Sequence, residues 1–172
     1  MVCRFGYASG AMPSRMSPEE RDRFLQGRHI AVLVTTDGEG RPVPTPIWYL
    51  YRDGLLYFRT DEASAKVANV RRDARVSVCV QEERAPYKAV IVHGTAAIED
   101  DPDWLAEDTP RHYLGFIGAI GYKQAAQSAI EMGPAVAIVV TPERFATWDY
   151  TEETPWYGRL WLFAKRLLPP WL

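Results

Sequence analysis

Residues 58–66 read FRTDEASAK, and within these nine positions the sequence changes from the pattern of a β-strand to that of a helix. Leu55–Thr60 predicts a strand, and the apolar residues between Asp61 and Asp73 recur at the spacing of a short helix. A strand that leads through a short loop into a helix exposes the free N–H groups of the first helical turn, which favour an anion. The stretch therefore predicts a strand-loop-helix unit that can bind an anionic group.

Four side chains of this stretch carry the chemistry that a phosphate site needs. Arg59 and Lys66 supply positive charge, and Thr60 and Ser64 supply hydroxyl donors. A solvated loop with ordinary surface cations has the same residue types. The local composition alone leaves both interpretations open.

Upstream of this stretch the sequence predicts a capped helix and a hairpin. Ser17 can cap a helix, and Glu20 completes a capping box. His29–Thr36 is rich in β-branched residues and ends in the turn sequence Asp37–Gly40. We expect Arg41–Arg52 to return as one long strand. Prolines at positions 42, 44 and 46 remove alternate N–H groups from it, so part of this strand must resemble a sheet edge.

Downstream, the sequence predicts further strands around a helical insert. Arg75–Glu82 and Tyr87–Glu99 indicate a hairpin, and Pro102–Met132 indicates a helical region interrupted by its glycines at 115–121. Ala135–Thr141 and Arg144–Trp148 indicate two final strands. Hairpin-connected strands favour an α+β fold, a split antiparallel β-barrel of about six or seven strands with flanking helices.

Composition limits the class of protein. The chain has 172 residues, of which 47% are hydrophobic and 24% charged, so it can form one domain with a sizeable core. We expect that domain at residues 17–155, with a flexible tail at 1–16 and a separate aromatic segment at 156–172. A net charge of −2 argues against a dedicated nucleic-acid binder. No signal peptide or membrane span is visible, which predicts a cytoplasmic protein. Cys3 and Cys79 have no metal spacing, so we expect no metal site.

The aromatic segment at 156–172 combines large apolar residues with cations. It holds Trp156, Trp161 and Trp171, with Arg159 and Lys165 among them. An amphipathic helix of this kind can rest on a membrane surface. Packing against the barrel or a second subunit would instead stabilise the protein by about 1.5–3 kcal/mol for each large side chain. We favour packing within the protein.

The order of these elements, with Thr-x-x-x-Ser-x-Lys at 60–66, resembles the pyridoxamine 5′-phosphate oxidase-like split β-barrel superfamily. The resemblance covers Pro18 to Asp149 and is strongest to the flavin/deazaflavin oxidoreductase branch, whose members bind coenzyme F420, FMN or occasionally a tetrapyrrole. The stretches that carry it are residues 28–38, 44–49, 66–73, 85–87 and 92–96. Each stretch is weak alone, whereas their order and spacing are specific.

The resemblance implies a set of cofactor-binding residues. Thr60, Ser64 and Lys66 match the family's phosphate-binding positions, with Arg59 beside them. The ring of the cofactor would lie against residues 45–48 and would be reached by residues 87 and 88, usually across a dimer interface; these are Thr45, Pro46, Ile47, Trp48, Tyr87 and Lys88. Trp48 is equally well interpreted as a plain core aromatic. Ala89 replaces the glutamine of true pyridoxamine phosphate oxidases, and their C-terminal Arg-Leu-His-Asp-Arg motif is absent, which argues against pyridoxal phosphate synthesis.

Two functions follow from the resemblance. The first is a homodimeric oxidoreductase in which F420 or FMN supplies a hydride to a small conjugated organic substrate. We favour F420, whose polyglutamate tail suits the cations Arg71, Arg72 and Arg75, although surface ion pairs explain these residues equally well.

The second function is that of a non-catalytic carrier of FMN, F420 or a tetrapyrrole such as haem. A haem carrier would need a ligand such as His93. No side chain stands out as the acid or base, and the catalytic residues are unknown.

Overall fold

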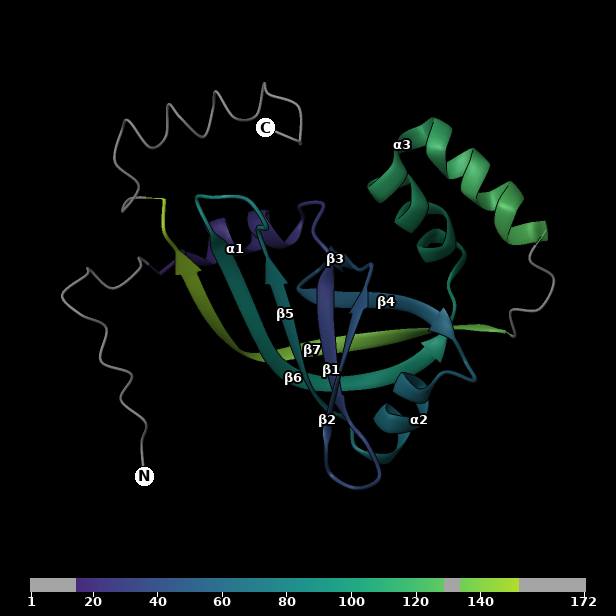
Figure 1. The fold of residues 1–172 in the computed structure, drawn as a ribbon, viewed down its shortest axis with the longest axis horizontal. Coiled ribbons are helices and arrows are strands. Elements are labelled where there is room, and N and C mark those ends of the chain that lie inside the picture. Colours follow the sequence, from purple (N-terminus) through teal and green to yellow (C-terminus); the bar gives the residue numbers. More distant parts are fainter. Residues whose placement is uncertain (1–14, 129–133, 152–172) are drawn as a thin grey trace.

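The computed structural model describes residues 15–128 and 134–151 (Figure 1), which form seven strands and three helices. The elements are α1 (Pro18–Leu25), β1 (Ala31–Thr36), β2 (Pro42–Ile47), β3 (Leu50–Arg52), β4 (Leu55–Asp61), α2 (Ala65–Arg72), β5 (Arg75–Gln81), β6 (Lys88–Asp100), α3 (Asp103–Ser128) and β7 (Ala135–Asp149). The predicted α+β class and the strand number are confirmed.

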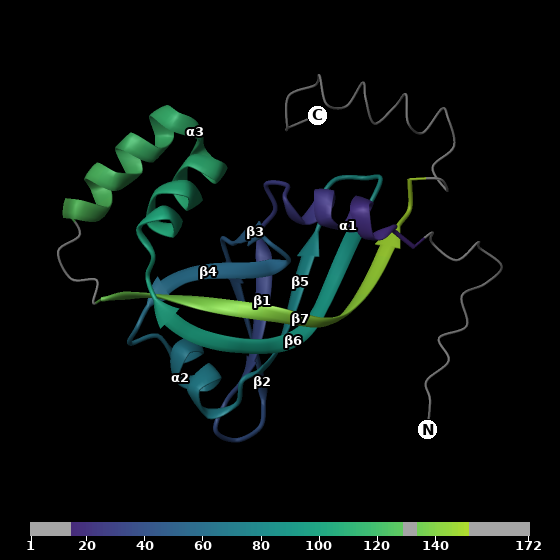
Figure 2. The ribbon, with the colours of Figure 1, turned by 180° about the vertical axis from the view of Figure 1, so that it is seen from behind.

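All seven strands belong to one antiparallel sheet in the order β2-β1-β5-β6-β7-β4-β3. β2 and β3 are the two edge strands, yet only Trp48 and Tyr49 separate them along the chain. Two residues span at most roughly 10 Å, so the edges must approach each other. The long β6 and β7 curve strongly to allow this (Figures 1 and 2). The sheet is thus a split barrel, and we call the Trp48–Tyr49 connection its seam.

The seam corrects one prediction, because Arg41–Arg52 is two strands rather than one. Tyr49 turns inward at this point and is 1% exposed, with its hydroxyl donating to the Leu25 carbonyl at 2.8 Å. The expected edge character is confirmed, since β2 pairs only with β1. Proline lacks an N–H, so the non-proline residues of β2 must supply the donors to β1.

A second correction concerns β7, which is one strand where two were predicted. It pairs with β6 along its whole length, with a bulge where His93 faces Arg144 and Gly94 faces Pro142. The bulge accommodates Pro142 without ending the strand. Gly94 is required there, because a Cβ at this position would lie 2.1 Å from the Thr141 carbonyl oxygen.

The two faces of the sheet are buried by different partners. Side chains on the inner face form the main core, to which α2 adds Val67 and Val70. A smaller cluster on the outer face joins Leu105 and Trp104 of α3 to Tyr57 of β4. Phe58 belongs to the main core. Alternate residues of β4 therefore face the core and α3.

The helices agree with their sequence signals. Both hydrogen bonds of the capping box between Ser17 and Glu20 are present, at 3.2 and 2.8 Å. The predicted interruption of the third helix occurs at Gly115, whose φ of 71° breaks α3 into two parts. None of the helices in the described ranges has both the length and the apolar character needed to cross a bilayer.

The expected terminal segments lie mainly outside the described residues. Residues 156–172 and the end of the predicted Pro102–Met132 helix belong to the undescribed ranges, as does most of the tail at 1–16. Met16 is the exception, since it is 8% exposed and its N–H donates to Thr147 Oγ1 at 3.1 Å. The described part of the chain thus begins just before Ser17, with Arg15 and Met16.

Candidate cofactor-binding site

Three of the predicted phosphate-binding side chains meet at the junction of β4 and α2. Lys66 Nζ donates to Thr60 Oγ1 at 3.0 Å, and Thr60 Oγ1 lies 3.4 Å from Ser64 Oγ. All three side chains are half-buried. One ammonium and two hydroxyl groups therefore converge where the strand ends and the helix begins, and we call them the Lys66 cluster.

The first turn of α2 adds backbone donors to this cluster. Ser64 is the N-cap residue, with φ −69° and ψ 148°, but its hydroxyl makes no capping hydrogen bond. Within the described ranges, the N–H groups of Ala65 and Lys66 have no acceptor, whereas Val67 and Ala68 donate to the Ser64 carbonyl. Free N–H groups at the positive end of a helix dipole attract an anion. The residues present thus fit a phosphate group.

The charge on Lys66 is unusual for this part of the molecule. None of the ion pairs among the described residues involves Lys66. Burial lowers the pKa of its ammonium, and the nearby Asp61 carboxylate opposes that shift only in part. A partly desolvated cation without a carboxylate partner is stabilised when an anion binds.

Arg59 does not join the Lys66 cluster. It faces the outer side of β4, opposite to Thr60, because successive strand residues point to opposite faces. Its Nε donates to Asp101 Oδ2 at 2.7 Å, just before α3 begins. The ion pair between Arg59 and Asp101 thus connects β4 to the residues just before α3.

The three arginines considered for a polyglutamate tail also have partners within the chain. Arg71 pairs with Glu62 at 2.6 Å, and Arg75 pairs with Asp73 at 2.7 Å. Arg72 donates to the Thr36 carbonyl and to Asn69 Oδ1. Arg71 and Arg75 thus match the alternative of surface ion pairs, whereas Arg72 has only neutral acceptors among the described residues.

The predicted ring-flanking residues lie on β2 and at the seam. Pro46 is exposed, Thr45 is half-buried, and Ile47 packs against the main core. Trp48 is half-buried and stacks on Tyr113 of α3, with ring centroids 4.8 Å apart and an interplanar angle of 5°. Tyr122 lies beside the same indole at 5.7 Å. Nothing in the sequence pattern pointed to the two tyrosines, because they reach Trp48 only through the packing of α3.

Tyr87 and Lys88 lie far from the Lys66 cluster within one chain. Lys88 faces Asp149 at one end of the β6–β7 pair, and its ammonium binds that carboxylate at 2.7 Å. Thr60 faces Val136, which pairs with Asp100 at the other end. The length of β6 between the two ends corresponds to roughly 40 Å of strand. Within one chain, Lys88 thus lies at the opposite end of β6 from the strand pair that leads to the Lys66 cluster.

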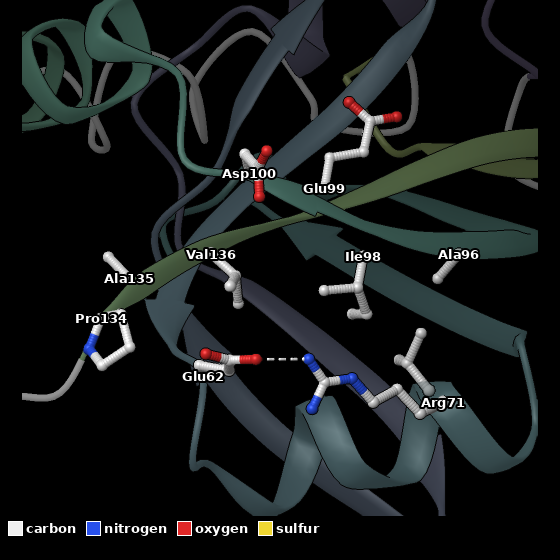
Figure 3. Close-up of a pocket in the computed structure, with 10 residues that line it drawn as sticks. Glu62, Arg71, Ala96, Ile98, Glu99, Asp100, Pro134, Ala135 and Val136 are labelled. Carbon is white, nitrogen blue, oxygen red and sulfur yellow. Dashed lines mark hydrogen bonds and ion pairs between the residues drawn. The ribbon is translucent and has the colours of Figure 1, made fainter.

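Two surface cavities of the described residues lie apart from the Lys66 cluster, since none of its three side chains lines them. A cavity of about 480 Å³ lies beside the C-terminal end of β6 (Figure 3), and Glu62, Arg71 and Asp100 are among its lining residues. Arg71 is the one cation of this lining, and it is already paired with Glu62. The lining therefore offers a phosphate no unpaired cation. A second cavity of about 470 Å³, lined by Arg52, Trp104 and others, lies between β3 and α3.

The described residues offer no metal centre. No group of three or more potential metal-ligating side chains occurs among them. His93 Nδ1 lies 2.9 Å from Ser77 Oγ, and His112 Nε2 lies 3.2 Å from the Gly27 carbonyl oxygen. Both histidines therefore have structural partners in the fold.

The curled seven-stranded sheet defines the fold as a split barrel. At the end of β4, two hydroxyls, an ammonium and a helix N-terminus form a site that fits a phosphate. The sequence matches the family described as pyridoxamine 5′-phosphate oxidase over residues 17–149, and the chain belongs to this family. The resemblance inferred from the sequence is thereby confirmed at the level of the superfamily.

Solved structures support the same fold. A conserved hypothetical protein from Mycobacterium tuberculosis is 25% identical, with a TM-score of 0.68 over 86% of this chain and 92% of that chain. An FAD-binding protein from Mesorhizobium loti is 23% identical, with a TM-score of 0.56 over 80% and 97% of the two chains. An F420 reductase is 21% identical, with a TM-score of 0.56 over 76% and 98%. A comparison with curated proteins finds no match.

Proposed function

We propose that this protein is an oxidoreductase that binds F420 or FMN through the ribityl phosphate of the cofactor. The Lys66 cluster carries the proposal. It joins two hydroxyls and a helix N-terminus to a half-buried ammonium that forms no ion pair with the residues the structure describes. Family membership and the similarity to an F420 reductase and an FAD-binding protein support the choice of a flavin or deazaflavin ligand.

The residues of this chain would position the cofactor rather than react with it. Lys66, Thr60 and Ser64 would hold the phosphate, and the segment Thr45–Trp48 would flank the ring. When bound, the cofactor supplies hydride transfer to a small conjugated substrate. Both cofactors carry a phosphate on a ribityl chain, so one cluster can serve either. The branch that the sequence resembles favours F420.

A homodimer forms part of this proposal. Tyr87 and Lys88 match cofactor-contacting positions, yet they lie at the opposite end of β6 from the Lys66 cluster. We infer that a second copy of the chain brings them to the same ligand. A two-fold axis would then create two equivalent sites, each built from both subunits.

The test is a titration of the purified protein with FMN and with F420. Lys66→Ala removes the ammonium and should weaken the binding of the preferred cofactor at least about tenfold, as expected for a lost charged hydrogen bond. Arg59→Ala is the matched control, since it removes a cation from the opposite face of β4. If wild-type protein binds neither cofactor, the proposal is wrong.

Turnover separates the enzyme from a carrier. Oxidation of reduced F420 or reduced FMN by a quinone-type acceptor should be faster with the wild-type protein than without it. Saturable cofactor binding with no acceleration would instead indicate a carrier. A Soret band that disappears in His93→Ala would indicate the haem alternative.

A further inference from the structure

The hydroxyl of Tyr113 lies at the seam of the barrel, where the two edge strands are connected. It donates to the His29 carbonyl at 2.7 Å or the Tyr49 carbonyl at 3.1 Å, and it accepts the Tyr49 N–H at 3.1 Å. This one side chain of α3 therefore binds the Tyr49 backbone, which lies at the break between β2 and β3, and reaches the His29 carbonyl just before β1. Burial raises the pKa of Tyr113, so the hydroxyl keeps the proton that it donates.

The ring of Tyr113 holds the neighbouring residue of the seam. The nearly parallel stack with Trp48 fixes the plane of the indole, and the tilted Tyr122 ring limits its rotation. Trp48 still remains half-buried, so part of its surface is accessible to a ligand. Tyr113 thus controls both the backbone and the side chain at the end of the segment Thr45–Trp48.

We propose that Tyr113 is a positioning residue for the cofactor ring, acting through Trp48. This inference rests on the proposed function, in which residues 45–48 flank that ring. The side chain of α3 would set the indole as one wall of the ring site, while the Lys66 cluster holds the phosphate independently.

A structural role alone does not require the ring stack. Tyr49 is already anchored in the core through its own hydroxyl and the Leu25 carbonyl. Tyr113→Phe would keep the stack and lose the hydrogen bonds, whereas Tyr113→Leu would lose both. The two variants separate the effect on the seam backbone from the effect on Trp48.

The experiment is a double-mutant cycle on the affinity for FMN, or for F420 if that is the cofactor bound. Trp48→Leu and Tyr113→Leu should each weaken binding about 3- to 10-fold, the range that one aromatic stacking contact provides. The double variant should bind no more weakly than Trp48→Leu alone, because Tyr113 acts through that ring. Lys66→Ala combined with Tyr113→Leu should give the product of the two single losses.

The ring environment gives a second readout. Visible circular dichroism of the bound cofactor should change in Tyr113→Leu and in Trp48→Leu. It should not change in Trp104→Phe, the control, because Trp104 of α3 packs in the outer-face cluster with Tyr57.

Unchanged affinity in Tyr113→Leu would overturn the inference while leaving the proposed function intact. Losses of affinity that multiply when Tyr113→Leu is combined with Trp48→Leu would do the same. Should Tyr113→Leu fail to fold, Tyr113→Phe still tests the inference, because it keeps the ring stack on Trp48. Its dichroism band should match that of the wild type while the band of Trp48→Leu differs, and an altered band in Tyr113→Phe would show that the seam hydrogen bonds, not the stack, act on the cofactor ring. If neither cofactor binds the wild type, the proposed function and this inference fail together.

Discussion

Lys66 differs from the other cations around α2 in the groups that it faces. Arg71, Arg72 and Arg75 all have acceptors within the chain, while Lys66 makes its one hydrogen bond in the described ranges to the hydroxyl of Thr60. Its lowered pKa follows from burial without a compensating ion pair. The charge state of this one residue should therefore govern how the site responds to pH.

Affinity for a phosphate cofactor should fall at alkaline pH. The ammonium of Lys66 loses its proton at a lower pH than an ordinary lysine, whose pKa is about 10.5, and the neutral amine no longer attracts the anion. Titrations with FMN or F420 between about pH 7 and pH 10 measure this loss. Lys66→Arg keeps its charge throughout that range, so its affinity should stay nearly constant. An equal decline in both proteins would contradict the assignment.

Arg59 should contribute to stability rather than to ligand binding. Among residues 15–128 and 134–151, Asp101 is bound through Oδ2, and its buried Oδ1 has no hydrogen-bond partner there. Arg59→Ala removes the cation that binds this carboxylate and should lower the free energy of unfolding by about 1–3 kcal/mol. Urea denaturation measures the change, and the affinity for the cofactor should stay within about twofold of wild type. A loss of affinity as large as that of Lys66→Ala would place Arg59 in the site.

At the scale of the elements, the β6–β7 pair depends on the close approach at Gly94. Gly94→Ala would place a methyl group against the backbone of Thr141, which cannot move aside without breaking the bulge. We expect the free energy of unfolding to fall by about 1–3 kcal/mol or more. Gly121→Ala in α3 is the matched control, because nothing lies within 4 Å of the added Cβ. Thermal unfolding of both variants checks the prediction, and equal melting temperatures would contradict it.

The elements also show which features the sequence could predict. The Lys66 cluster was predictable, because Thr60, Ser64 and Lys66 are brought together by one local strand-loop-helix unit. The separation of Arg59 from Thr60 was also implicit in the two-residue period of a strand. Tyr113 could not be found in this way, since it contacts Tyr49 across 64 residues and no local pattern reports that packing. The seam was missed for a related reason, because Trp48 and Tyr49 have the composition of a strand.

At the scale of the whole molecule, the proposed composite site can be tested by mixing subunits. Lys66→Ala and Lys88→Ala homodimers should both bind cofactor weakly, since each site lacks one group. A mixed dimer of the two chains has one site with both defects and one intact site, so it should bind one cofactor per dimer with wild-type affinity. Light scattering should give twice the chain mass of 19.5 kDa. A monomeric mass, or unchanged affinity in Lys88→Ala, would contradict the composite site.

The prolines of β2 have a consequence for the behaviour of the protein at high concentration. The ring nitrogens of β2 point away from β1 at Pro42, Pro44 and Pro46. The outer side of this edge therefore offers carbonyl acceptors but no N–H donors at these three positions. A strand from another molecule would find half of its hydrogen bonds missing there. The edge is thereby protected against the strand-by-strand growth that leads to aggregates.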